Sequence, residues 1–137
     1  MTRDPLKYIV PIGRVLFALV FLVAAPGHFT AETIDQAAGH GVPLATVAVP
    51  LSGLMSALGG LGVALGYRAR LGAWLIVLFL VPVTFMMHDF WAATDPAAAQ
   101  LQRIMFMKNL SMLGGALLIA YHGAGPISLD ARAGRDD

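Results

Sequence analysis

The feature that most constrains this chain is a long apolar run without charges, Leu71 to Met87, which ends in the ionisable pair His88 and Asp89. About 20 residues of helix are enough to cross the hydrocarbon core of a bilayer. Phe90 and Trp91 directly after the pair are typical of an aromatic anchor at the membrane interface. The run therefore predicts a transmembrane helix that carries ionisable groups, which are costly and often functional there, at or just inside one membrane face.

Composition extends this prediction to the whole chain. Of its 137 residues, 58% are hydrophobic and 12% are charged, whereas a soluble domain carries about 25% charged residues. We expect an all-α membrane protein with a single domain, a four-transmembrane-helix bundle. Its spans should cover about residues 8–26, 44–66, 70–90 and 104–122. A signal peptide is the competing interpretation of the first segment, although Arg14 interrupts that segment.

Charge and cysteine content exclude several classes of protein. The net charge is +1 and no Lys/Arg-rich run is present, so nothing favours a nucleic-acid partner. With no cysteine, the chain forms no disulfide, thiolate metal site or thiol redox relay. We also expect no metal site, because the methionines of the later spans suit packing in the hydrophobic core better than coordination of a metal.

The distribution of basic residues indicates the orientation. With four spans, one side of the membrane receives Arg3, Lys7, Arg68, Arg70, Arg132 and Arg135. Arg103 is the only basic loop residue on the other side. The positive-inside rule then places both termini in the cytoplasm. His28, His88 and Asp89 would lie toward the outer face.

Small residues dominate the second expected span, and glycine and proline mark its boundaries. Ser52, Ser56 and Gly60 recur every four residues, a pattern that predicts close helix packing. The same face would also suit association with a partner or with a second copy of the chain. Pro26 and Gly27 predict a helix break followed by a loop up to Pro43.

Polar residues of separate expected helices define a candidate site. Lys108 lies inside the fourth span, where an ammonium group needs a partner or water. Asp89 is the best acidic partner, so we predict a polar pocket near the outer leaflet formed by His28, His88, Asp89, Lys108 and Asn109. In the alternative, Lys108 and Asp89 form a structural ion pair and both histidines simply lie in the interface.

Helical spacing assigns faces to the first and fourth spans. Residues 7 apart return to nearly the same face of a helix. The first stripe contains Arg14, Phe17, Phe21 and His28; the second contains Lys108, Ser111, Gly115 and His122. Arg14 itself has three interpretations: its side chain snorkels to the cytoplasmic headgroups, pairs with Asp130, or binds an anionic or carbonyl ligand.

Four motifs in order resemble the DoxX family of small bacterial membrane proteins. They are Gly13-Arg14-Val15-Leu16 with the later His28-Phe29, then His88-Asp89-Phe90-Trp91, Phe106-Met107-Lys108-Asn109-Leu110, and Gly123 to Asp130. The resemblance covers nearly the whole chain. It implies a multi-pass protein of the bacterial inner membrane that is associated with redox chemistry, quinones or an oxidoreductase partner.

Two functions follow as expectations. In the first, the pocket binds a quinone or a similar carbonyl compound: Lys108 and Asn109 donate to a carbonyl, and His88, oriented by Asp89, relays a proton. His88, Asp89 and Lys108 are then the catalytic candidates. No flavin, haem or dinucleotide motif is present, so electrons would come from a partner protein or a bound small molecule. The sequence therefore does not decide whether the chain is an enzyme.

In the second, the chain is a non-catalytic membrane anchor or assembly subunit for an oxidoreductase. A third interpretation, a small transporter component, is disfavoured because a single four-helix unit contains no inverted repeat.

Overall fold

Helices account for almost all of the regular structure in this computed structural model, which describes residues 5–135. Four segments are long and apolar enough to cross a membrane: Pro5–Phe29, Ala45–Leu65, Ala69–Ala92 and Pro96–His122. The predicted all-α bundle of four transmembrane helices is therefore confirmed. In chain order the elements are η1 (Pro5–Tyr8), α1 (Ile9–Ala24), η2 (Ala25–Phe29), α2 (Ala31–Gly39), α3 (Ala45–Leu65), α4 (Ala69–Met87), η3 (Phe90–Ala92), α5 (Pro96–His122) and α6 (Leu129–Arg132).

The helices differ from the sequence prediction at two places, and at each of them a capping residue begins a helix. The expected loop before Pro43 contains helix α2, whose first turn is capped by Thr30 through a hydrogen bond from the backbone N–H of Thr33. Helix α5 begins at Pro96 rather than near residue 104. There the carboxylate of Asp95 accepts a hydrogen bond of 2.8 Å from the N–H of Ala98, and a proline at the first helical position suits a helix start.

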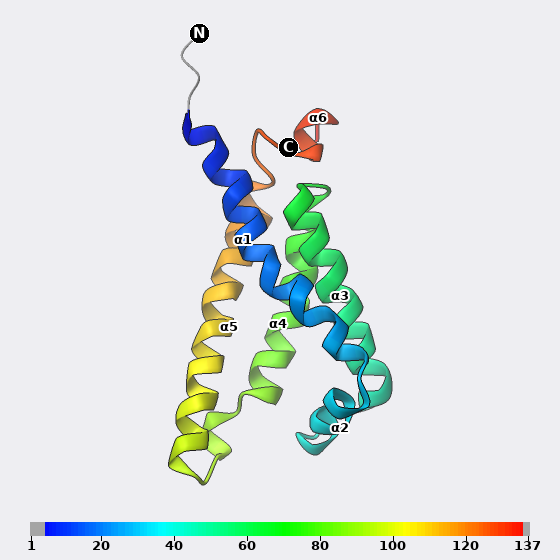
Figure 1. Cartoon of the computed structure of the whole chain (residues 1–137), viewed down its shortest axis with the longest axis vertical. Coiled ribbons are helices and arrows are strands. Elements are labelled where there is room, and N and C mark those ends of the chain that lie inside the picture. The colour runs from blue at the N-terminus through cyan, green and yellow to red at the C-terminus, as the bar shows by residue number, and fades with distance from the viewer. Residues whose placement is uncertain (1–4, 136–137) are drawn as a thin grey trace.

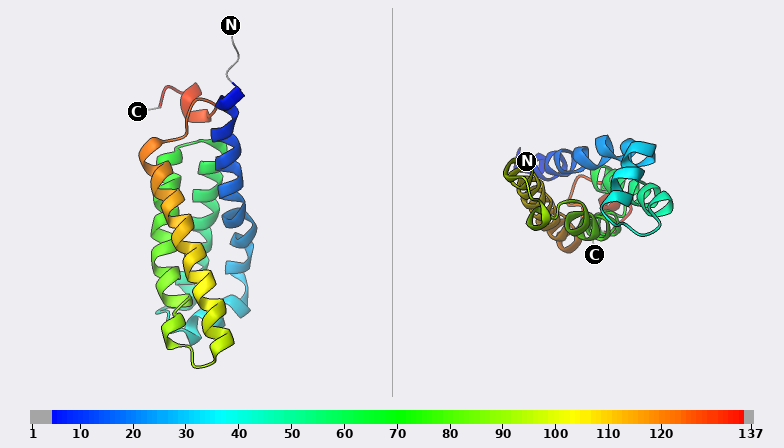
Figure 2. Two further views of the ribbon diagram at one scale, coloured as in Figure 1. Left: turned by 90° about the vertical axis from the view of Figure 1, so that its left-hand side faces the viewer. Right: turned by 90° about the horizontal axis from the view of Figure 1, so that it is seen from below.

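The four spanning helices alternate in direction and pack in the order α1, α3, α4, α5 (Figures 1 and 2). Elements η1 and α6 lie at one end of the bundle, which we call the terminal end, together with the turn between α3 and α4. Helix α2 and element η3 lie at the opposite, distal end. Helix α1 crosses the bundle obliquely (Figure 1) and packs mainly against α3; it also approaches α5 where Phe17 meets Gly115.

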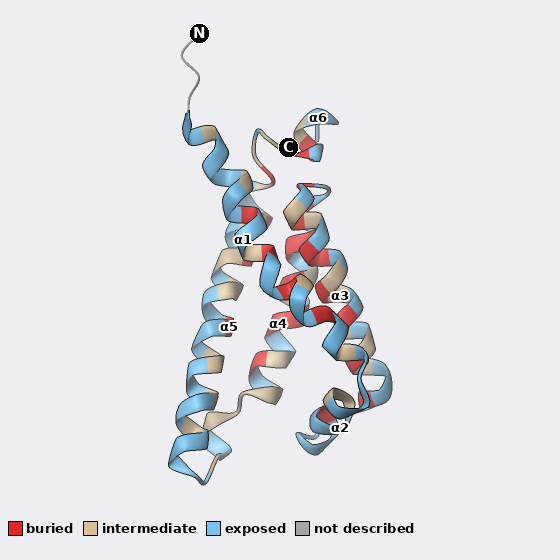
Figure 3. Ribbon diagram, in the orientation of Figure 1, coloured by how far each residue is buried: buried red, intermediate tan, exposed pale blue. Residues whose placement is uncertain are grey.

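Basic residues gather at the terminal end, as the sequence predicted, although Arg3 lies outside the described residues. That this end faces the cytoplasm stays a prediction. The outer surfaces of the helices are exposed (Figure 3). They carry many large apolar side chains, as expected for contact with lipid.

The small residues of α3 permit close contacts with its neighbours, as their spacing predicted. A Cβ atom added at Gly59 would lie 2.8 Å from the backbone oxygen of Gly72 in α4. A Cβ at Gly60 would lie 3.2 Å from the Cβ of Phe21 in α1. Ser56 donates a hydrogen bond of 3.1 Å to the backbone oxygen of Phe21. The centre of the bundle is buried around these contacts by Ala18, Phe21, Val63, Ala73, Ile76, Phe79, Leu80, Ala116 and Ala120.

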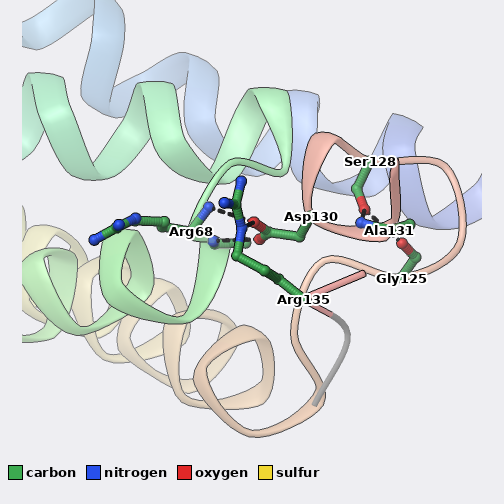
Figure 4. A network of polar contacts seen from close by, with 7 residues as sticks. Arg68, Gly125, Ser128, Asp130, Ala131 and Arg135 are labelled. Atoms are coloured by element: carbon green, nitrogen blue, oxygen red, sulfur yellow. Dashed lines mark hydrogen bonds and ion pairs between the residues drawn. The ribbon is translucent and has the colours of Figure 1, made fainter. Parts of the chain in front are cut away.

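The segment after α5 folds across the terminal end and is held there by Asp130 (Figure 4). Its carboxylate accepts hydrogen bonds from the backbone N–H groups of Arg68 at 2.7 Å and Ala69 at 2.9 Å, and so caps the start of α4. The N–H of Asp130 donates to the backbone oxygen of Gly66 at 2.8 Å. Arg135 completes the cluster with a charged contact of 3.3 Å to the same carboxylate.

These contacts change the acidity of Asp130. Burial alone would raise the pKa of its carboxyl group, but the N–H groups of Ala69 and Arg68 and the guanidinium of Arg135 outweigh burial, so the pKa lies below its ordinary value. A group with a lowered pKa in the folded state stabilises the fold above the pKa of the unfolded chain, about 4. This stabilisation is lost as the pH falls through the lower pKa of the folded state.

Replacing Gly59 by alanine should destabilise the bundle, because the new methyl group meets the backbone of Gly72. Overpacking of this kind costs about 1–3 kcal/mol. The matched control is Gly114→Ala in α5, where an added Cβ has no neighbour within 4 Å. Thermal unfolding in detergent micelles should show a lower Tm for Gly59→Ala and an unchanged or higher one for Gly114→Ala. Equal behaviour of the two variants would contradict the close contact.

Replacing Asp130 by asparagine should lower the free energy of unfolding by about 1–2 kcal/mol at neutral pH, because α4 loses a charged cap. The loss should shrink as the pH is lowered below about 4. Asp35→Asn is the control, since that side chain is exposed on α2 and makes no hydrogen bond or ion pair with another described residue. Unfolding measured from pH 7 down to pH 3 tests this, and a pH-independent difference would argue against the cap.

Candidate functional site

A cavity of about 360 Å³ lies between α2, α3 and α4 in the distal half of the bundle. Pockets for small molecules have volumes of about 300–1,000 Å³. Its wall is apolar except for four residues, His28, Thr33, Ser52 and His88. The apolar part consists of Ala37, Val42, Ala48, Val49, Leu51, Met55, Leu78, Phe79, Pro82, Val83, Met86 and Met87.

The packing of α3 explains why the cavity lies in this half. Helices α3 and α4 touch at Gly59 and Gly72, toward the terminal end, and diverge toward the distal end (Figure 1). Helix α2 covers the space between them, since Ala37 packs with Ala45 and Val49 of α3 in a small buried cluster. The cavity is therefore a product of tight packing at one end of the helix pair and separation at the other.

His28 enters the cavity from η2 and is fixed on three sides. Its Nδ1 lies 3.1 Å from the backbone oxygen of Ala24. Its ring stands edge-on to Phe79, with the centroids 5.5 Å apart. A Cβ atom at Gly53 would lie 2.5 Å from the Cβ of His28, so the absence of a side chain at this position of α3 makes room for the histidine.

His88 lies just after the last turn of α4 and is held by α5. Its Nδ1 is 2.8 Å from the side-chain oxygen of Gln102. The expected partner, Asp89, instead lies 3.7 Å from Nδ1 of His40, at the end of α2. The expectation that Asp89 orients His88 is thus corrected: an amide from α5 positions the ring, and the carboxylate links α2 to the linker after α4.

These contacts determine which nitrogen of each ring is left for a ligand. The oxygens of Ala24 and Gln102 accept hydrogen bonds, so Nδ1 carries the proton in both His28 and His88. Nε2 is the remaining nitrogen in each ring. In a neutral imidazole it accepts a hydrogen bond, and in a protonated one it donates.

Only part of the predicted polar pocket is assembled. His28 and His88 line the same cavity, but Asp89, Lys108 and Asn109 do not. Lys108 is exposed, and its Nζ lies 3.4 Å from the sulfur of Met105. Within residues 5–135 no ion pair joins Lys108 to Asp89, so the alternative of a structural pair is not observed either.

The rotation of α5 accounts for the position of Lys108. The predicted stripe of the first span points inward, with Arg14 and Phe21 buried. The predicted stripe of the fourth span points inward only at Gly115, where an added Cβ would lie 2.9 Å from the ring of Phe17. Its other members, Lys108, Ser111 and His122, are exposed, while Asn109, on the neighbouring face, is buried. Apolar side chains cover both the packed and the lipid-facing surfaces of α5, so hydropathy alone did not distinguish these faces.

Arg14 lies at the terminal end, away from the cavity. Its guanidinium is buried and donates hydrogen bonds to the backbone oxygens of Ala124 and, at 2.6 Å, Ile127. It therefore neither snorkels nor forms an ion pair with Asp130 among the described residues. Arg14 ties α1 to the same C-terminal segment that caps α4.

Three contributors to the site were not predicted from the sequence: Gln102, Thr33 and Gly53. Gln102 precedes residue 104, where the fourth span was expected to begin, and Thr33 lies in the expected loop before Pro43, which instead contains helix α2. Gly53 is next to Ser52 in α3, and the richness of this helix in small residues was the available signal for a position where another residue approaches closely.

Comparison with known proteins identifies the family. Residues 2–135 match the SURF4 family. The chain is 32% identical over 121 residues to the inner membrane protein YqjF of Escherichia coli, with 87% of each chain covered. It is 29% identical over 123 residues to the inner membrane protein YphA of the same organism, covering 88% of this chain and 87% of the relative. No solved structure matches this chain.

The match corrects the resemblance to the DoxX family. The four motifs are real features of the sequence, but the whole-length match is to a different family. With its four apolar helices and its inner membrane relatives, the chain is a multi-pass protein of the inner membrane, as expected. It belongs to the SURF4 family.

Proposed function

We propose that this protein binds a small, largely apolar molecule that carries a carbonyl or hydroxyl oxygen, the chemical class that includes quinones and quinols. The observation that carries the proposal is the cavity of about 360 Å³ in which His28 and His88 are the two ionisable side chains within an apolar wall. Ligand sites typically combine a mostly hydrophobic lining with a few polar groups that fix the orientation of the ligand.

The chemistry of the two imidazoles supports this class of ligand. With Nδ1 of each ring engaged by a protein oxygen, Nε2 accepts a hydrogen bond from a ligand hydroxyl when the ring is neutral. When the ring is protonated, the same atom donates to a ligand carbonyl. Thr33 also lines the cavity, and its hydroxyl lies 3.0 Å from that of Thr30. Asp89 and Lys108 have no part in this proposal.

The association with redox chemistry is not carried forward. It rested on the resemblance to the DoxX family, which the SURF4 match replaces. Binding of a quinone-like molecule needs no electron transfer, so the proposal concerns recognition. Catalysis by His88 would need an electron source that the sequence does not supply by any recognised motif.

The alternative function, a membrane anchor or assembly subunit for an oxidoreductase, was suggested by the small-residue face of α3, and the structure does not leave this face free. The predicted small-residue face of α3 is occupied within the chain, since Ser56 and Gly60 both pack against Phe21 of α1. The neighbouring glycines are covered as well, with Gly59 against α4 and Gly53 against His28. The face is therefore not a free surface for a partner helix.

Titration calorimetry of the protein in lipid nanodiscs tests the proposal. The probes are methylhydroquinone, methylbenzoquinone and toluene, which share a ring and a methyl group but differ in their oxygens. The variants His28→Phe and His88→Phe keep an aromatic ring and remove both nitrogens. Each should weaken binding of the oxygenated probes about fivefold, the equivalent of one hydrogen bond, and leave toluene binding unchanged.

His122→Phe is the control, because this exposed histidine lies at the terminal end and does not line the cavity. Equal weakening of all three probes in the cavity variants would mean that the rings act by shape alone. Binding of toluene as tight as that of methylhydroquinone would contradict recognition of the oxygens.

A further inference from the structure

We propose that the ligand enters the cavity sideways from the bilayer, between α3 and α4, and that it carries a hydrocarbon tail which stays in the lipid. This inference rests on the proposed function and specifies its ligand as an amphiphile. It concerns the route by which the cavity communicates with its surroundings and the part of the ligand that remains outside.

The opening is defined by one leucine from each helix. Leu51 of α3 and Leu78 of α4 both line the cavity and are 54% and 60% exposed. A side chain that lines a cavity and is also more than half exposed stands at the edge between the cavity and the outer surface. The two leucines therefore mark a lateral window between α3 and α4.

The depth of this window places it in the hydrocarbon region. Leu78 precedes His88 by ten residues, which corresponds to about 15 Å along a helix. The hydrocarbon core is about 30 Å thick, and the residues around Leu78 belong to a spanning segment, Ala69–Ala92. The window therefore faces lipid tails rather than water. A polar group would lose its hydrogen bonds to water there, so the part of a ligand that lies in the window should be apolar.

The other walls of the cavity are occupied by protein. On the side of α1, His28, Phe79 and Phe21 stack edge-on, with centroids 5.5 and 6.3 Å apart. Over the distal end, the buried cluster around Ala37 holds α2 against α3. The contact of His40 with Asp89 at 3.7 Å links the end of α2 to the linker after α4.

The chemistry of the two regions differs accordingly. His28 lies at the depth of the window, because its ring contacts Phe79, the neighbour of Leu78. An oxygenated head that passes the window thus meets an imidazole inside the cavity, while the chain attached to it remains between Leu51 and Leu78 and in the bilayer. The site suits a molecule that is itself dissolved in the membrane, with a small ring or carbonyl head on a long hydrocarbon chain.

The test compares a tailed probe with a tail-less one in nanodiscs, with concentrations expressed as mole fractions in the bilayer. Dodecylhydroquinone and methylhydroquinone have the same head. Leu78→Trp and Leu51→Trp narrow the window, and we expect each to weaken binding of dodecylhydroquinone at least tenfold. Both leucines also line the cavity, so binding of methylhydroquinone should weaken too, but at least fivefold less than that of dodecylhydroquinone, since this probe has no chain between the helices.

The controls are Leu71→Trp and Leu58→Trp, which lie seven residues away on the same helices, are 54% exposed, and do not line the cavity. They should affect neither probe. If the window variants leave dodecylhydroquinone binding unchanged, or weaken both probes equally, the lateral window is wrong. A different result would contradict the proposed function itself: no binding of methylhydroquinone to the unmodified protein, or equally tight binding to the unmodified protein and to His28→Phe.

Discussion

The close approach of α3 to α4 at Gly59 and Gly72 is the contact on which the remaining structure depends. Two helix backbones come near van der Waals contact there, and a single methyl group would disturb them. Because the helices are pinned at this point, they diverge on one side of it only. The diverging halves enclose the cavity, and helix α2 covers them. Helix packing in a membrane relies on such small-residue contacts, because the hydrophobic effect does not favour the association of helices within lipid.

The two ends of the bundle use polar groups differently. At the terminal end, Arg14 and Asp130 are buried and bind mainly backbone groups: the two terminal nitrogens of the guanidinium donate to the oxygens of Ala124 and Ile127, and the carboxylate caps α4. Nε of Arg14 has no hydrogen-bond partner among the described residues. These charges have structural partners and hold the C-terminal segment in place. In the distal half, His28 and His88 each engage one ring nitrogen with a protein oxygen and leave the other for a ligand. This difference separates a structural cluster from a candidate binding site.

The sequence predicted the number and approximate position of the spanning helices, because runs of apolar residues of this length have few alternatives. It also predicted that α3 packs closely, from the spacing of its small residues. It did not predict helix α2, since its short amphipathic sequence lies between breakers, nor the early start of α5, which depends on the cap at Asp95.

The candidate site was predicted in part. Both histidines were identified because ionisable residues near an apolar span are unusual. The assignment of Lys108 and Asp89 to the same pocket failed because it depended on the rotation of α5 about its axis. A lipid-facing helix has apolar residues on every side, so its sequence carries little information about rotation. The link from His88 to Gln102 depends on the path of the linker between α4 and α5, for which the sequence offers no periodic signal.

The central claim is that the cavity between α3 and α4 holds an oxygenated, membrane-soluble molecule through His28 and His88. Mass spectrometry of the compounds extracted from protein transferred directly from its membrane into nanodiscs tests this claim most directly. The account predicts a non-phospholipid compound with a carbonyl or hydroxyl head in near-stoichiometric amount, strongly depleted in the double variant His28→Phe, His88→Phe. Extracts that contain only phospholipids in the proportions of the surrounding membrane, for both proteins, would contradict it.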